Sequence, residues 1–189
     1  MDNVDDILQK LYGNVLDSDG KRIPGTRIMV FGTRIFAPKY LTSDDVIVCT
    51  DLVDYIYLKR IGTYHNLHYV AHNKVSEWVN KNQFLENLYN CIGNKHGIDM
   101  KLGETITNPP YDGDLHLQIL DELTKISDKV VCIHPARWVE DVIAKYKNGN
   151  ADGNKYEHLK KMLTKVMMIK QADGCKMFNI GLPQDMMIG

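Results

Sequence analysis

The sequence lacks closely spaced cysteines and long apolar stretches. Its four cysteines, Cys49, Cys91, Cys132 and Cys175, form no CxxC pair, which excludes the usual pattern of zinc ribbons and thiol redox sites. No run of about 18 apolar residues could span a bilayer, and the acidic start of the chain differs from the basic and then apolar start of a secretory signal. We therefore expect a soluble, cytoplasmic protein with reduced thiols and no membrane partner.

The chain also has little net charge. Its formal charge is -1 over 189 residues, so the overall balance does not attract nucleic acid, whose binding depends on clustered Lys and Arg. A local surplus occurs between Lys145 and Lys176, where eight lysines stand against three acidic residues. This segment could face a polyanion, although a solvated helix face is the more common explanation.

What is present is the composition of one ordinary globular domain. Hydrophobic residues make up 44% of the chain and charged residues 25%. Short apolar runs alternate with longer helical patterns, which is typical of β-α-β units. We predict a single α/β domain over residues 1–189, with a mostly parallel sheet and helices on both of its faces.

Four apolar runs predict strands, and six amphipathic segments predict helices. The predicted strands cover residues 27–31, 45–50, 66–70 and 129–133. The predicted helices cover residues 4–12, 52–60, 74–90, 113–127, 138–146 and 156–170. An incomplete antiparallel hairpin is expected at the end, with strands at 176–180 and 185–188. Because the chain stops at Gly189 inside a predicted strand, we expect a truncated or split domain.

The motif most informative about function is Asn108-Pro109-Pro110-Tyr111. The two prolines fix φ and keep the preceding residue out of helical space, so the loop is expected to be stiff. A stiff loop can hold Asn108 Oδ1 and the Pro109 carbonyl oxygen as acceptors for the two N–H protons of one amino group. Tyr111 offers a π-face on which a flipped base could stack. An ordinary turn would explain Asn-Pro-Pro alone.

With its preceding strand and its extension over residues 112–120, this loop resembles the active-site loop of methyltransferases that act on amino groups. It is most similar to the loop of phage and bacterial DNA adenine-N6 methyltransferases. The resemblance covers roughly residues 26–140, which leaves 141–189 as a helical and hairpin segment. It implies a Rossmann-like class I methyltransferase fold, S-adenosylmethionine as cofactor, DNA as substrate and no metal. Asn108, Pro109, Pro110 and Tyr111 would be the catalytic residues.

The same resemblance assigns the cofactor to the ends of the first three strands. Phe31 and Gly32 would lie at the cofactor turn, where the family usually has two or three glycines and this chain has one. Asp51 and Leu52 would follow the second strand, with Asp51 on the ribose hydroxyls, and Asn73 would contact the adenine. Asp51 equally suits the N-cap of the following helix.

Three interpretations of the function remain open. The first is methylation of adenine N6 in DNA. The same loop also occurs in enzymes that methylate a protein glutamine or guanine N2 in RNA. The third is a methyltransferase-like domain that binds without turnover, which the single Gly32 favours. Because no target-recognition domain is recognisable, a second chain or a missing C-terminal region could supply recognition. Arg137 could meet a phosphate, and Trp138 could line the target pocket or pack on the core.

Overall fold

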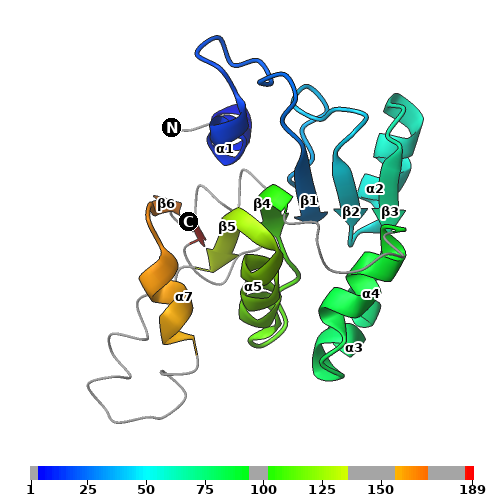
Figure 1. The fold of residues 1–189 in the computed structure, drawn as a ribbon, viewed down its shortest axis with the longest axis vertical. Helices are drawn as coiled ribbons and strands as arrows, with labels where there is room; N and C mark the ends of the chain where they lie inside the picture. Colours follow the sequence, from blue (N-terminus) through cyan, green and yellow to red (C-terminus); the bar gives the residue numbers. More distant parts are fainter. Residues whose placement is uncertain (1–3, 94–101, 136–155, 170–185) are drawn as a thin grey trace.

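The chain folds into an α/β domain built on one seven-stranded sheet, as seen in a computed structural model that describes residues 4–93, 102–135, 156–169 and 186–189 (Figure 1). The strands in these residues are β1 (Ile28–Gly32), β2 (Val46–Cys49), β3 (Asn66–Tyr69), β4 (Leu102–Asn108), β5 (Ser127–Pro135), β6 (Met167–Ile169) and β7 (Met186–Ile188). Their order across the sheet is β3-β2-β1-β4-β5-β7-β6.

The sheet is mostly parallel, as predicted. Strands β1 to β5 pair in parallel, and β7 runs antiparallel to both of its neighbours, β5 and β6. Every residue of β1 and β2 is buried, which is typical of parallel strands covered on both faces. The last strand is paired along both edges, and Gly189 continues the pairing through two backbone hydrogen bonds with Cys132, at 2.8 and 3.0 Å. The antiparallel arrangement expected at the end of the chain is therefore confirmed for β7, which pairs with β5 and β6.

Helices cover both faces of the sheet, as predicted. They are α1 (Val4–Leu11), α2 (Leu52–Ile61), α3 (His72–Asn80), α4 (Phe84–Cys91), α5 (Leu115–Ile126) and α7 (Glu157–Met162), with a 3-10 turn at Gly13–Val15. Alternating side chains of β1 divide the core, because Val30 packs with α1 on one face, whereas Met29 and Phe31 pack with α3, α4 and α5 on the other. In the described residues, no helix combines the length and apolar character needed to cross a bilayer.

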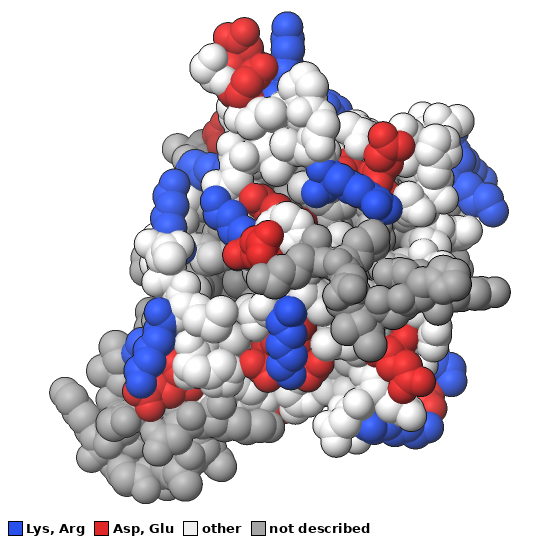
Figure 2. Space-filling model, in the orientation of Figure 1, with Lys and Arg blue, Asp and Glu red and all other residues white. Residues whose placement is uncertain are grey.

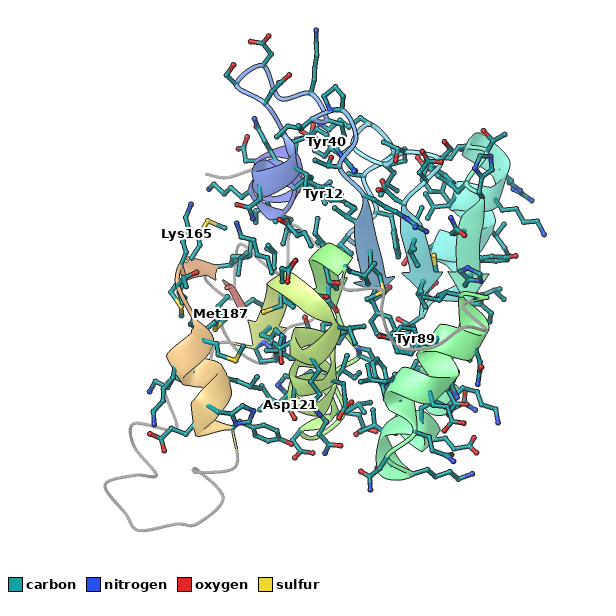
Figure 3. The ribbon with its side chains drawn as sticks, viewed as in Figure 1. Tyr12, Tyr40, Tyr89, Asp121, Lys165 and Met187 are labelled. Carbon is teal, nitrogen blue, oxygen red and sulfur yellow. The ribbon has the colours of Figure 1, made fainter. Side chains whose placement is uncertain are left out.

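The connection between the neighbouring parallel strands β1 and β2, residues 33–45, contains no helix. Contacts with the chain around α1 hold it instead. The Tyr12 hydroxyl donates a hydrogen bond to the Ile35 carbonyl at 3.0 Å, and the rings of Tyr12 and Tyr40 lie 5.4 Å apart (Figure 3). Burial raises the pKa of Tyr12 above its usual range, so the hydroxyl remains a donor at any physiological pH.

The chain leaves β1 toward β2 and β3 on one side and returns through α3 and α4 to β4 on the other side of β1. The direction in which strands are added to the sheet therefore reverses between β1 and β4, which makes this pair of strands a topological switch point. In open α/β sheets, ligands bind in the crevice outside the carboxyl ends of the strands at such a switch point.

Two helix predictions need correction. The predicted helix 74–90 is two helices, because the chain breaks between them at Asn82, which adopts a left-handed φ of 54°. The predicted helix 156–170 ends at Met162, and Met167–Ile169 forms β6 because its backbone pairs with β7. The predicted strand 176–180, the predicted helix 138–146, Arg137 and Trp138 lie outside the described residues, as does most of the segment rich in lysine.

Candidate functional site

A cavity of about 330 Å³ lies at the carboxyl ends of β1, β2 and β4, within the size range of small-molecule sites. Its lining residues come mainly from segments that directly follow strands: Thr33, Arg34, Thr50, Asp51, His72, Asn108, Pro109, Pro110, Tyr111, Ile133 and Met186. Asp51 and the loop Asn108–Tyr111 are thus brought together from the ends of two strands that are not neighbours in the sheet.

Hydrogen bonds hold the side-chain amide of Asn108 at both ends. Its Nδ2 donates to the Thr33 carbonyl oxygen at 2.7 Å, and its Oδ1 accepts a hydrogen bond from the Tyr111 hydroxyl. The backbones of the same two segments are also joined, because the Thr33 N–H donates to the Asn108 carbonyl at 3.1 Å. The donor to Thr33 can only be the NH₂ group, so Oδ1 has a defined direction toward Tyr111.

Tyr111 covers the Asn108 amide with its hydroxyl and keeps part of its ring open to solvent. The hydroxyl also lies 2.9 Å from the Ile133 carbonyl oxygen, and since it has one proton it donates to only one of these two acceptors at a time. Burial of the hydroxyl raises the pKa of Tyr111 well above its usual range, whereas the residue as a whole is 38% exposed. The Tyr111 hydroxyl thus occupies one of the two lone pairs of Asn108 Oδ1.

Gly32 is required by the close approach of β1 to β4. Its φ is +126°, and a Cβ at this position would lie 2.0 Å from the Asn108 carbonyl oxygen. The missing side chain thus lets the two strands meet, and Gly32 does not line the cavity. Phe31 does not line it either, because its side chain is fully buried and packs edge-on against Phe84, with ring centroids 5.7 Å apart.

Asp51 caps α2 and also faces the cavity. Its Oδ1 accepts a hydrogen bond from the Val53 N–H at 2.7 Å, so the capping role is confirmed. Among the described residues, no group is hydrogen-bonded to its Oδ2. The neighbouring Leu52 is 50% exposed and does not line the cavity. Asn73 lines an adjoining polar groove of about 720 Å³, which meets the cavity at His72.

The loop after β1 is fixed by a residue that the sequence analysis did not identify. Asp54, in the first turn of α2, accepts hydrogen bonds through Oδ2 from the Thr33 hydroxyl at 2.8 Å and from the Arg34 N–H at 3.0 Å. Arg34 adopts a left-handed φ of 56° there. Thr33, Thr50 and His72 line the cavity but were not predicted, although each closely follows a strand. Met186 also lines the cavity, and no feature of the sequence around it indicated this.

Two histidines form an uncharged wall behind Tyr111. The ring of His116 meets the Tyr111 ring edge-on at 5.6 Å and lies 5.2 Å from the ring of His134. Burial lowers the pKa of His116 to about 4 and that of His134 well below its usual value. Both rings are therefore neutral near pH 7, which keeps the surroundings of the Asn108 amide free of cationic donors from these residues.

Comparisons with protein-family models, with curated proteins and with solved structures find no match to this chain. Within the described residues, no three His, Cys, Asp or Glu side chains gather in a way that could hold a metal ion. A functional assignment therefore depends on the residues that line the cavity.

Proposed function

We propose that the chain transfers the methyl group of S-adenosylmethionine to N6 of adenine in DNA. The observation that carries the proposal is that the loop Asn108–Tyr111 and Asp51 line one cavity at the switch point of the sheet. The mostly parallel sheet, the helices on both faces and the antiparallel β7 support a Rossmann-like class I methyltransferase fold.

The polar groups of the cavity fit the cofactor. The Oδ2 atom of Asp51 is available to accept from the ribose hydroxyls, while Oδ1 remains on the helix cap. Thr50 and His72 also line the cavity and add hydrogen-bonding groups to those of Asp51. When bound, S-adenosylmethionine supplies an electrophilic methyl group. Phe31 and Leu52 are left out of this proposal, because neither lines the cavity.

Asn108 and Pro109 act on the target amine. Asn108 Oδ1 and the Pro109 carbonyl oxygen accept hydrogen bonds from its two N–H groups. These bonds localise the lone pair on nitrogen and make a conjugated amine more nucleophilic. The bond from Nδ2 to the Thr33 carbonyl keeps Oδ1 aimed while this happens. The Tyr111 hydroxyl retains the Ile133 carbonyl as an acceptor when the amine binds at Oδ1.

Charges on the described surface are mixed, which bears on how DNA is held. Blue and red side chains alternate on the side shown in Figure 2. Lys74 and Lys81 both pair with Glu77, at 2.8 and 2.6 Å, and Lys125 pairs with Glu122 at 2.6 Å. A surface on which the two signs alternate has few of the clustered Lys and Arg on which phosphate binding depends. We therefore assign target recognition to a second chain or to a further region.

A labelled methyl group from S-adenosylmethionine tests the proposal. We expect transfer to DNA that contains unmodified adenine and none to the same DNA with N6-methyladenine in its place. Transfer only to protein or only to RNA would show that the target is a glutamine or guanine N2. Calorimetry that detects cofactor binding without any transfer would favour a binding domain, and the absence of binding to a folded sample would contradict the proposal entirely.

Replacing Asp51 separates its two roles. We expect Asp51→Ala to weaken cofactor binding and to lower stability by about 1 kcal/mol, since the helix cap is lost. Asp51→Asn keeps an acceptor for the Val53 N–H but removes the charge, so it should weaken cofactor binding with little loss of stability. Calorimetry and urea unfolding measure the two effects. Unchanged cofactor binding in both variants would leave Asp51 with the capping role alone.

Replacing Tyr111 separates the hydroxyl from the ring. We expect Tyr111→Phe to keep methyl transfer within about threefold of the native chain, because the stacking face remains and Asn108 Oδ1 keeps its lone pairs for the amine. Tyr111→Ala should lower kcat/KM for DNA by about 5- to 150-fold, since base stacking contributes about 1 to 3 kcal/mol. Steady-state KM and kcat on one DNA substrate measure this, and equal losses in the two variants would refute a stacking role.

A further inference from the structure

The peptide group between Thr33 and Arg34, which we call the 33–34 peptide, is held from both sides. Its carbonyl oxygen accepts a hydrogen bond from Asn108 Nδ2 at 2.7 Å. Its N–H donates to Asp54 Oδ2 at 3.0 Å. A trans peptide group is planar, so its carbonyl and its N–H point in opposite directions and turn together. Asp54, from the first turn of α2, thus sets the direction of the carbonyl that holds the Asn108 amide.

The backbone at Arg34 needs this support. Its φ of 56° lies in the left-handed region, which residues other than glycine seldom adopt. Rotation of the 33–34 peptide would return Arg34 to a negative φ and would turn the Thr33 carbonyl away from Asn108. Asp54 opposes this rotation with two bonds, because its Oδ2 also accepts from the Thr33 hydroxyl at 2.8 Å. An unfavourable backbone conformation that the surroundings hold in place is typical of functional sites.

We propose that Asp54 is a positioning residue, which keeps Asn108 Oδ1 aimed at the target amine by holding the 33–34 peptide. The inference rests on the proposed methyl transfer, in which Asn108 orients the amine. Asp54 does not line the cavity, so it acts through Asn108 and not on the reacting groups. Its carboxylate also polarises the peptide, which strengthens the hydrogen bond that the Thr33 carbonyl accepts.

Nuclear magnetic resonance tests this role without any methyl transfer, because the Asn108 side-chain amide reports its own position. In the full chain labelled with ¹⁵N, the Asn108 NH₂ signals are identified by their loss in Asn108→Ala. We expect Asp54→Ala to shift these signals and to speed the exchange of their protons with water at least about fivefold, because the bond to Thr33 weakens. Unchanged Asn108 signals in Asp54→Ala would overturn the proposal.

Asp17→Ala is the matched control. One oxygen of Asp17 also accepts two hydrogen bonds, from the N–H groups of Asp19 and Lys21, both at 2.9 Å, in a turn that does not line the cavity. This variant should leave the Asn108 signals in place, and equal shifts in it would contradict a specific role of Asp54. Circular dichroism verifies folding. If Asp54→Ala does not fold, Asp54→Ser takes its place with the same expected result, because a serine hydroxyl reaches less far than a carboxylate.

Rates separate positioning from a general loss of stability. We expect Asp54→Ala to lower kcat about tenfold and to keep KM for DNA within about twofold, since the amine still binds while its acceptor is misaligned. Asp54→Asn retains an oxygen that can accept both bonds, so its kcat should stay within about threefold of the native value.

A double variant shows whether Asp54 acts through Asn108. In a chain that already carries Asn108→Ala, Asp54→Ala should lower the rate by no more than about twofold, because the residue that it positions is gone. A further loss as large as that in the native background would refute the connection. A native chain that transfers no methyl group would contradict the proposed function alone, and the Asn108 signals would still decide the role of Asp54.

Discussion

Replacing Asn108 with alanine is expected to lower the rate of methyl transfer by about 10²- to 10³-fold, the range seen when one preorganised hydrogen-bonding group is removed from an active site. Cofactor affinity should stay nearly unchanged, because Asn108 acts on the target amine while Asp51 acts on the cofactor. Single-turnover rates measure the first effect and calorimetry the second. A loss of cofactor affinity as large as the loss of rate would refute this division of roles.

The structure adds a complication and a control to this experiment. The Asn108 amide also donates to the Thr33 carbonyl and accepts from Tyr111, so alanine removes two internal hydrogen bonds, each of about 1 kcal/mol. Asn108→Asp keeps oxygen acceptors for the amine and loses the donor to Thr33. We expect its rate to fall between those of the native chain and Asn108→Ala, with a similar loss of stability in both variants. Equal rates in the two variants would mean that the loop geometry matters and the acceptor does not.

The sheet was largely predictable from the sequence because its strands are buried on both faces. The apolar runs at 27–31 and 45–50 match β1 and β2 to within one residue at each end. Parallel strands end at one edge of the sheet, and Asp51 and Asn108, which lie at the ends of two of them, both line the cavity. The same reasoning did not locate β6, since the lysines around Met167–Ile169 continue the pattern of a polar helix face.

The contacts within the site were not predictable, because they join segments far apart in the chain. Asn108 and Thr33 are 75 residues apart and meet only because β1 pairs with β4. The resemblance predicts Gly32 as the cofactor glycine, and its φ and its closeness to Asn108 add a role in strand packing that the sequence did not indicate. Sequence patterns report which side chains are buried, and they do not report which strands become neighbours.

Replacing Asp45 is expected to have the largest effect on stability. Asp45 is completely buried, and its two oxygens accept from Arg22 at 2.9 and 3.0 Å in a bidentate pair. They also accept from the backbone N–H groups of Ile28, at 3.1 Å, and Thr42, at 2.8 Å. Asp45→Ala leaves the Arg22 guanidinium and two backbone donors without their acceptor, so we expect a loss of about 3 to 5 kcal/mol in the free energy of unfolding. Urea unfolding measures it.

Two further variants test the cause of this loss. Asp5→Ala removes a partner of the exposed Lys39, 3.0 Å away, and should leave the unfolding midpoint unchanged. The double variant Arg22→Met with Asp45→Leu removes both buried charges, so it should lose less than Asp45→Ala alone. A double variant that is less stable than the single one would show that packing around Arg22, and not its uncompensated charge, accounts for the loss.

The Asp45 network also explains how β1 and β2 hold their positions with no helix between them. Arg22 donates to the Tyr40 carbonyl at 2.7 Å as well as to Asp45, and so ties the middle of the 33–45 connection to the start of β2. Asp45 in turn holds the first residue of β1 through Ile28. These bonds lie at the amino ends of the strands, opposite the cavity. We therefore expect Asp45→Ala to lower stability while the molecules that remain folded bind the cofactor as tightly as the native chain.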